Sequence, residues 1–296
     1  VKTDGSFRLA LEHFDYVTGL RMTGERFHAL FGGPPRREDE LLTTRHMDIA
    51  ASIQEVTQEV VARLARGAIE RAGSRDLCLA GGVALNCVAN GRLLADRVCD
   101  RLWVQPASGD AGGSLGAALV VHHHFLGAPR AVAAGLDAMA GAYLGPSFDQ
   151  AAVETRLSAA GARFRVQEEE ALVAETAAAL AAGAAVGWFQ GRMEFGPRAL
   201  GARSILGDPR SPAMQRTLNL KIKYRESFRP FAPSVLREDL VDWFELDADS
   251  PYMLLVAGVR SERRIAMGEA ERALFGIDRL NVPRSDIPAV THVDYS

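Results

Sequence analysis

The chain contains few cysteines, no long apolar run and no excess of positive charge, and each shortage excludes a class of protein. Its three cysteines, Cys78, Cys87 and Cys99, form no CxxC pair, so we expect buried or half-buried thiols in a reducing cytoplasm rather than a disulfide framework or a zinc site. No apolar run reaches the roughly 20 residues that cross a bilayer, and no signal peptide is recognisable, so we expect no membrane partner. The formal net charge of −3 argues against a nucleic-acid partner bound through a broad basic face.

Familiar catalytic motifs are also missing. The sequence holds no HExxH or HxxH pair, no G-x-S-x-G elbow and no P-loop. The run of histidines at 122–124 does not replace them, because consecutive residues of a helix point about 100° apart and chelate one ion poorly. The sequence therefore shows no lone nucleophile.

What is present is the composition of a globular protein, with 48% hydrophobic and 24% charged residues and a length that suits about two domains. Hydrophobic periodicity predicts strands at 6–12 and 184–191, and helices at 48–73, 149–161 and 169–183. A stretch rich in Gly, Ala and Pro at 127–148 places a domain boundary near residue 140. Both ends of the chain have strand-like sequence, so we interpret it as a piece of a longer protein.

Two strand–glycine–helix units follow one another at 76–96 and 101–125. This order is typical of α/β nucleotide or phosphate sites, where ligands collect at the carboxyl ends of strands near helix N-termini. In the first unit Gly81 and Gly82 end the strand, and Asn86 supplies an amide that can hydrogen-bond a ribose or a base. A tight turn that needs glycine for a positive φ explains the same residues equally well.

The second unit carries a single acid, Asp110, beside Gly112 and Gly113. An aspartate at this position commonly caps the helix that follows, which stabilises it by ~1 kcal/mol. The functional alternative is a carboxylate that binds a metal or positions a nucleotide hydroxyl. We favour the functional alternative, because the loop follows another glycine unit.

The C-terminal half holds permanent cations on bent backbone. The stretch "EFGPRALGARSILGDP" (194–209) places Arg198 and Arg203 among glycines and next to Pro197. These glycines and the proline indicate a loop rather than a helix. Arginines held on such a loop suit an oxyanion such as phosphate, carboxylate or carbamate.

A second basic loop, "KIKYRESFRPFAP" (221–233), adds Lys223 and Arg229 among other cations. Its X-Pro pairs force extended backbone. Solvated surface cations are the alternative interpretation, but Phe228 and Phe231 are expected to anchor this loop in a core. We therefore predict an anion site formed by both loops.

Five blocks carry a resemblance to a known family: "LAGGVALNCVANGRL", "QPASGDAGGSLGAAL", "FQGRMEFGPRALGARSILGDP", "NLKIKYRESFRPFAPSV" and "IPAVTHVDYS". In this order they resemble the ATP-dependent O-carbamoyltransferases of antibiotic and nodulation-factor biosynthesis. The match covers most of the chain, and "FGPRALG" and "FRPFAP" are its most specific parts. The resemblance implies an α/β domain at 1–140, the C-terminal portion of an actin/hexokinase/Hsp70-like (ASKHA) ATPase domain. It implies an α+β, YrdC-like carbamoyl-phosphate-binding domain, truncated at its C-terminus, at 141–296.

The resemblance also implies a chemistry. Arg198, Lys223 and Arg229 would bind carbamoyl phosphate as catalytic residues; the carbamate it yields would attack ATP, giving carbamoyl-adenylate and pyrophosphate. The carbamoyl group would then pass to a hydroxyl of a small-molecule acceptor, such as a natural product or a sugar. Asp110 would bind a divalent metal, Fe²⁺ or Mg²⁺. The residues implied to bind ATP and the adenylate are Gly81, Gly82, Asn86, Gly112 and Gly113.

The chain departs from the family pattern in two ways. It lacks the HxxH-type motif that supplies the other metal ligands, and it ends before a further arginine of the anion site. We therefore expect residues 1–296 alone to be inactive, the rest being supplied by a longer chain, a separate subunit or a homo-oligomer. Two rival functions stay open: a relative that acts on tRNA or protein, and a non-catalytic nucleotide-binding subunit. The absence of CxxC pairs and of a broad basic surface argues against the first.

Overall fold

The computed structural model describes residues 1–132, 135 and 137–296. Their contacts divide them into two compact units. Unit 1 comprises Val1–Leu77 and Val88–Trp103, and unit 2 comprises Cys78–Cys87 and Val104–Ser296. The chain therefore passes between the units three times. Among the described residues, no helix is both long and apolar enough to cross a membrane.

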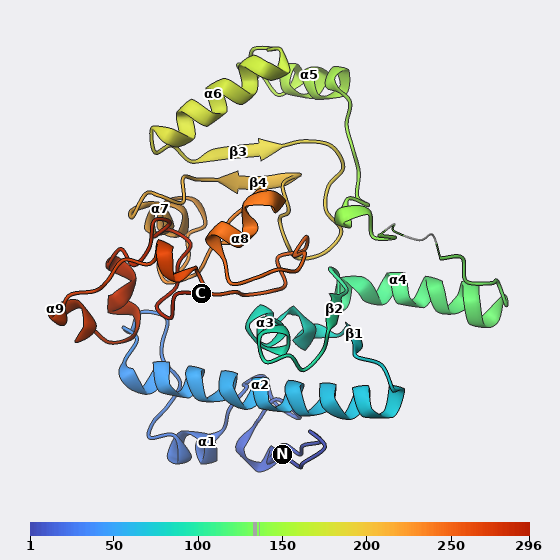
Figure 1. Cartoon of the computed structure of the whole chain (residues 1–296), viewed down its shortest axis with the longest axis vertical. Coiled ribbons are helices and arrows are strands. Elements are labelled where there is room, and N and C mark those ends of the chain that lie inside the picture. The colour runs from blue at the N-terminus through green and yellow to red at the C-terminus, as the bar shows by residue number, and fades with distance from the viewer. Residues whose placement is uncertain (133–134, 136) are drawn as a thin grey trace. The chain divides into compact units, whose positions relative to one another are not determined.

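Unit 1 is built on the long helix α2, Thr44–Ala72, which appears with the short helix α1, Glu25–Leu30, on one side of it (Figure 1). The helix begins where the Thr43 amide donates to Nδ1 of His46 and ends at Gly73, whose φ of 63° is left-handed. This residue was the predicted stop signal, and the predicted helix at 48–73 is confirmed with four further residues at its start.

Both predicted strand–glycine–helix units are present. Strand β1, Asp76–Leu79, precedes the 3-10 turn η2, Gly82–Leu85, and helix α3, Cys87–Ala95. Strand β2, Arg101–Val104, precedes helix α4, Asp110–Val120, and the π-helical turn η3, Val121–Phe125. The strands pair, and the amides of Asp100 and Gln105 donate to the carbonyls of Arg75 and Leu79, both at 3.0 Å. This same-direction register is that of parallel strands, so the two glycine turns lie at the same end of the pair.

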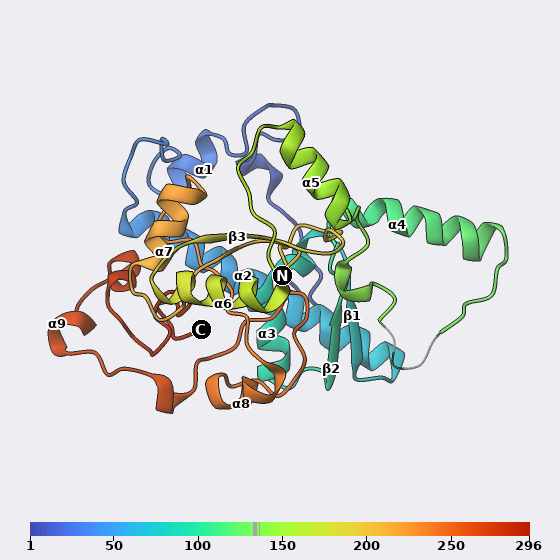
Figure 2. The ribbon, with the colours of Figure 1, turned by 90° about the horizontal axis from the view of Figure 1, so that it is seen from above.

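The remainder of unit 2 contains a second small sheet. Strands β3, Val186–Phe189, and β4, Arg203–Leu206, pair antiparallel, with Val186 opposite Leu206. Helix α6, Glu169–Ala181, runs alongside β3 in both views (Figures 1 and 2). Helix α5, Gln150–Ala159, precedes it and is capped by Asp149, so the two helices and the strand predicted here are confirmed.

Short helices and turns complete unit 2. The helices and 3-10 or π turns are η4 Ala140–Ala142, α7 Met214–Thr217, η5 Leu218–Ile222, η6 Arg237–Asp239, α8 Leu240–Trp243, η7 Ser261–Arg263, α9 Glu269–Arg272 and η8 Gly276–Asn281. One apolar cluster joins Met214, Leu218 and Ala289, with Phe231 packed against it. The predicted anchoring of the second basic loop through Phe231 is therefore confirmed.

The strand predicted at 6–12 is wrong, as is the strand-like assignment of the last ten residues. The first segment is irregular and enters a 3-10 turn at Leu11–His13, and the last contains turns and no strand. The amide of Phe14 bonds to the Leu11 carbonyl, that of Tyr295 to the His292 carbonyl and that of Ala289 to the Pro209 carbonyl, and none of these carbonyls belongs to a strand. Alternating apolar residues make a strand only where a neighbouring strand accepts these groups.

The mixed helices and strands agree with the predicted α/β character. The ASKHA and YrdC-like assignments and the boundary near residue 140 stay predictions. Residues 133, 134 and 136 of the boundary stretch lie outside the described part of the chain.

Candidate functional site

Two glycine loops from different strands are joined at their backbones. The Gly81 amide, directly after β1, donates to the Ser108 carbonyl, in the loop after β2, at 2.9 Å. A side chain built on Gly81 or Gly82 would meet no atom within 4 Å. Gly81 has a φ of 102°, as a tight turn requires. Gly82 has neither a positive φ nor a close neighbour, and Asn86 ends the turn half-buried.

The loop after β2 explains one of its own glycines. A Cβ on Gly112 would lie 2.1 Å from the Ala107 carbonyl oxygen, so close packing requires glycine there. Gly113 faces open space instead. Ser108 is 7% exposed, and within the described residues its hydroxyl has no hydrogen-bond partner. A buried hydroxyl left unpaired costs about 1–3 kcal/mol, so Ser108 is a ligand-contact candidate that the sequence patterns missed.

Asp110 is the first residue of α4 and lies exposed at its N-terminus. The cap residue is Gly109, and Asp110 makes no side-chain cap, so the alternative interpretation of Asp110 as a helix cap is wrong. No group of three His, Cys, Asp or Glu residues that could hold a metal occurs in the described part of the chain. One carboxylate does not make a metal site, and the metal assignment stays a prediction.

Arg198 connects the proline-stiffened loop Glu194–Arg203 to the first glycine turn. Its Nη2 donates to the Leu85 carbonyl at 3.1 Å, across 113 residues of sequence. Its Nε is buried and has no partner among the described residues. Gly196 permits this approach, because it has a φ of 131° and its Cβ position lies 3.0 Å from the Pro106 carbonyl. The loop therefore presents a half-buried guanidinium with an unused donor beside the glycine turn.

Arg203 has a different use. Its guanidinium donates to the carbonyls of Gln190, Gly191 and Ala202 at 2.8–3.3 Å and lies 3.4 Å from the centre of the Phe189 ring. These contacts use the donors of the Arg203 side chain within its own loop and at the neighbouring strand end. Arg203, the second arginine of this motif, therefore has a structural role.

Two buried side-chain amides hold the second basic loop through hydrogen bonds to its carbonyls. Asn219, fully buried, donates to the Ser227 and Arg229 carbonyls at 3.0 and 2.9 Å, and Gln215 donates to the same Arg229 carbonyl at 3.1 Å. The side chains of Lys223 and Arg229 lie exposed on this clamped loop. Arg229 also approaches Glu226 at 3.6 Å.

Arg225 is the half-buried cation of this loop. Its Nε donates to the Asn219 side chain at 2.7 Å, and its guanidinium lies over the Phe231 ring. Burial lowers its pKa, and the nearby charge of Arg229 lowers it further. Glu226 offsets part of this charge, but the loop keeps a net positive charge, which favours an anion.

The structure thus brings together Arg198 and the turn at 81–86, and separately clamps the loop with Lys223 and Arg229. Among the described residues, no contact joins Arg198 to Lys223 or Arg229. The convergence of these three cations on one anion therefore stays a prediction. Sequence reasoning missed the residues that hold the loops in place. Glu194, whose carboxylate accepts three amides of the Arg198 loop, could have been noticed as the one acid of "EFGPRALG", whereas no local pattern marks Asn219 or Gln215.

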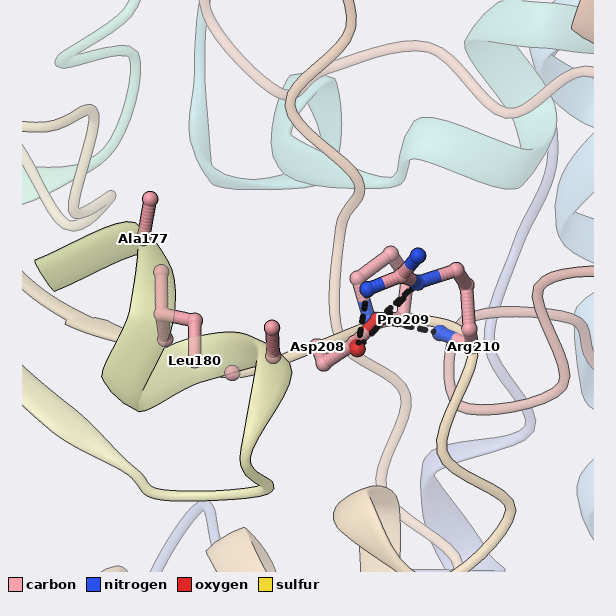
Figure 3. A pocket seen from close by; sticks show the side chains of 7 residues that line it. Ala177, Leu180, Asp208, Pro209 and Arg210 are labelled. Carbon is pink, nitrogen blue, oxygen red and sulfur yellow. Dashed lines mark hydrogen bonds and ion pairs between the residues drawn. The ribbon is translucent and has the colours of Figure 1, made fainter. Parts of the chain in front are cut away.

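A small hollow elsewhere in unit 2 is not part of this site. It has a volume of about 290 Å³ and lies between α6 and residues 207–210 (Figure 3). Its polar wall is Asp208, whose carboxylate accepts from Arg210 at 2.8–3.2 Å. This pairing keeps the pKa of Asp208 below its ordinary value and leaves the wall without net charge.

Two family profiles match most of the chain. Residues 1–119 match the family profile described as "Carbamoyltransferase N-terminus", and residues 177–296 match the one described as "Carbamoyltransferase C-terminus". The chain belongs to the carbamoyltransferase family, a family of transferases, which confirms the resemblance stated from its motifs.

Individual relatives agree with this assignment. The chain is 57% identical to an uncharacterized protein of Synechocystis, over 100% of this chain and 48% of that protein. It is 42% identical to nodulation protein NolO of Bradyrhizobium diazoefficiens, over 79% and 42% of the two lengths. It is 34% identical to the 3'-hydroxymethylcephem-O-carbamoyltransferase of Streptomyces clavuligerus, over 83% and 40%. The chain thus spans less than half the length of these relatives.

Proposed function

We propose that the protein to which this chain belongs transfers a carbamoyl group from carbamoyl phosphate to a hydroxyl of a small-molecule acceptor, with ATP as co-substrate. The observation that carries the proposal is Arg198. A half-buried guanidinium whose Nε lacks a partner among the described residues, held against a glycine turn, is a group that suits an anionic ligand. The Streptomyces relative is named an O-carbamoyltransferase, which supports the same activity.

The basic residues would bind the phosphate of carbamoyl phosphate. Arg198 offers a planar donor pair, and Lys223 and Arg229 offer exposed cations on a loop clamped by Asn219. Such fixed donors neutralise charge on the phosphate and stabilise the charge that develops as the bond to the carbamoyl carbon breaks. Water adds to the carbamoyl carbon and phosphate leaves, which gives carbamate. The carbamate oxygen then attacks the α-phosphorus of ATP, and pyrophosphate leaves.

The glycine turns would hold the nucleotide. Open space over Gly81, Gly82 and Gly113 lets phosphates approach the backbone, and Asn86 supplies an amide for the ribose or base. The unpaired Ser108 hydroxyl adds a donor at the same place. The acceptor hydroxyl would then attack the carbamoyl carbon of the adenylate, and AMP would leave. No step is assigned to a metal, because Asp110 alone does not provide a site.

Isothermal calorimetry with carbamoyl phosphate tests the proposal, on this chain and on the full-length gene product. We expect Arg198→Ala and Lys223→Ala to weaken binding by about tenfold or more, as the loss of a charged hydrogen bond does. Arg165→Ala serves as the control, because Arg165 is an exposed arginine paired with Glu175. Unchanged binding in both site variants would remove the basic loops from the mechanism. Nucleotide binding without carbamoyl transfer by the full-length protein would instead indicate a non-catalytic subunit.

A further inference from the structure

A buried carboxylate lies at the base of the Arg198 loop and has no part in the function proposed above. Glu194 is 7% exposed, although glutamate is rarely buried this deeply. Its Oε1 accepts hydrogen bonds from the amides of Leu200, Ala202 and Arg203 at 2.7, 2.9 and 3.3 Å. One oxygen thus gathers three amides of the same loop.

The carboxylate is held in its charged form. Burial alone would raise the pKa of Glu194, but the amides of Leu200, Ala202 and Arg203 outweigh it and hold the pKa below its ordinary value. Hydrogen bonds to an ionised acceptor are about twice as strong as neutral ones. The negative charge therefore adds to the rigidity of the loop.

The bonded amides determine where Arg198 lies. Glu194 precedes the arginine by four residues, and its three partners follow within five, so the chain returns on itself around Arg198. Tyr143, which lies outside this loop in the sequence, also holds it, because its hydroxyl donates to the Leu200 carbonyl at 2.5 Å. The Phe195 amide donates to the Ala142 carbonyl at 2.6 Å. With both arms fixed, the guanidinium is directed at the Leu85 carbonyl.

We propose that Glu194 is a positioning residue for the anion-binding side chain of Arg198. Its carboxylate acts as a template for the loop and touches neither substrate nor nucleotide. Because it acts through Arg198, the inference rests on the proposed function.

A double-mutant cycle tests this role on the full-length gene product, with carbamoyl phosphate as the titrant. Glu194→Gln keeps the shape of the side chain and removes its charge. We expect it to raise the Kd about tenfold, the effect of weakening charge-assisted hydrogen bonds. In an Arg198→Ala background the same change should add less than about twofold, because a residue that acts through another loses its effect when the other is gone.

The control is Asp149→Asn, another carboxylate that accepts a backbone amide, here at the start of α5. It should leave the Kd within about twofold of the wild type, within the spread of surface substitutions. Should Glu194→Gln not fold, Tyr143→Phe supplies the second variant, since it removes one hydrogen bond from the same loop and should weaken binding about fivefold.

The outcomes separate the two proposals. Wild-type affinity in Glu194→Gln, or in Tyr143→Phe if the first variant is unfolded, overturns the positioning role while a weakened Arg198→Ala still supports the proposed function. Equal losses from Glu194→Gln with and without Arg198 also overturn it, because the carboxylate then acts independently. Wild-type affinity in Arg198→Ala overturns the part of Arg198 in the proposed function and the positioning role with it, and wild-type affinity in Lys223→Ala as well overturns the proposed anion site.

Discussion

Three arginines of unit 2 show how one side chain takes different structural roles. Arg198 has a donor without a partner among the described residues, beside a glycine turn, whereas Arg203 donates to carbonyls of its own loop and of the neighbouring strand end. Arg284 is 1% exposed, and its guanidinium donates to the carbonyls of Arg279, Val282, Thr291 and His292. Burial lowers its pKa. Composition predicts only that these charges exist; the partner of each depends on tertiary contacts.

Arg284→Met is expected to destabilise unit 2 by about 3 kcal/mol, because it leaves several buried carbonyls without donors. Chemical denaturation of the two proteins measures the difference. Arg272→Met is the control, an exposed arginine with one long bond to the Gly268 carbonyl, and it should change the free energy of unfolding by less than about 0.5 kcal/mol. Equal effects of the two substitutions would contradict the role of Arg284.

Glu194 makes stability depend on pH in a definite direction. Its pKa in the folded state lies below the ordinary value of 4.5, so the folded state favours the ionised carboxyl. The stability it contributes is present above pH 4.5 and is lost as the pH falls through the lower, folded-state value. We expect the free energy of unfolding to fall more steeply below pH 4.5 in the wild type than in Glu194→Gln. Parallel pH profiles from urea titrations would show that its carboxyl is not held ionised.

At the scale of elements, helix and strand signals that depend on nearby residues were predictable. Helix α2 ends where Gly73 allows a left-handed turn, and both glycine turns follow short strands as predicted. The strand at 6–12 was wrong because alternation does not show whether a partner strand is present. The clamp by Asn219 was not predictable, because an amide inside a short helix carries no local mark of its bonds to residues eight and ten positions later.

Asn219→Ala is expected to release the basic loop. It removes two hydrogen bonds to loop carbonyls and one acceptor for Arg225, at a cost of about 2–3 kcal/mol. Hydrogen exchange of the amides of 223–229 should rise, while that of β3 stays unchanged. Ser211→Ala, in the loop before α7, is the control with no such clamp. Wild-type exchange in the Asn219 variant would show that the loop is held by other contacts.

For the molecule as a whole, the sequence predicts which motifs form the site but not how these motifs are arranged in space. The motif around Arg198 and the turn at 81–86 were each recognised, but a contact across 113 residues has no signature in either. The same limit applies to Lys223 and Arg229, whose residue types suit an anion while their spatial relation to Arg198 stays a prediction.

The apolar surface of α4 and η3 gives a prediction for the chain as a whole. None of the residues in α4 is buried, and Val120, Val121 and Phe125 are 57%, 51% and 83% exposed. Exposed apolar patches bind hydrophobic ligands. We expect the folded chain to bind the dye ANS, and Val121→Ser with Phe125→Ser to reduce its fluorescence severalfold. Absence of dye binding by the folded wild type would contradict an accessible apolar face.

The path of the chain between its two units limits how this protein can exchange sequence with its relatives. Residues 78–87 belong to unit 2, while the residues on either side of them belong to unit 1. A single recombination junction anywhere between 78 and 103 would therefore combine parts from two parents within both units. A junction just before residue 78 would keep unit 2 from one parent and divide unit 1. The two units cannot both be inherited intact from different parents through one crossover, so a chimaera that keeps both units whole requires paired junctions that move residues 78–87 together with residues 104–296.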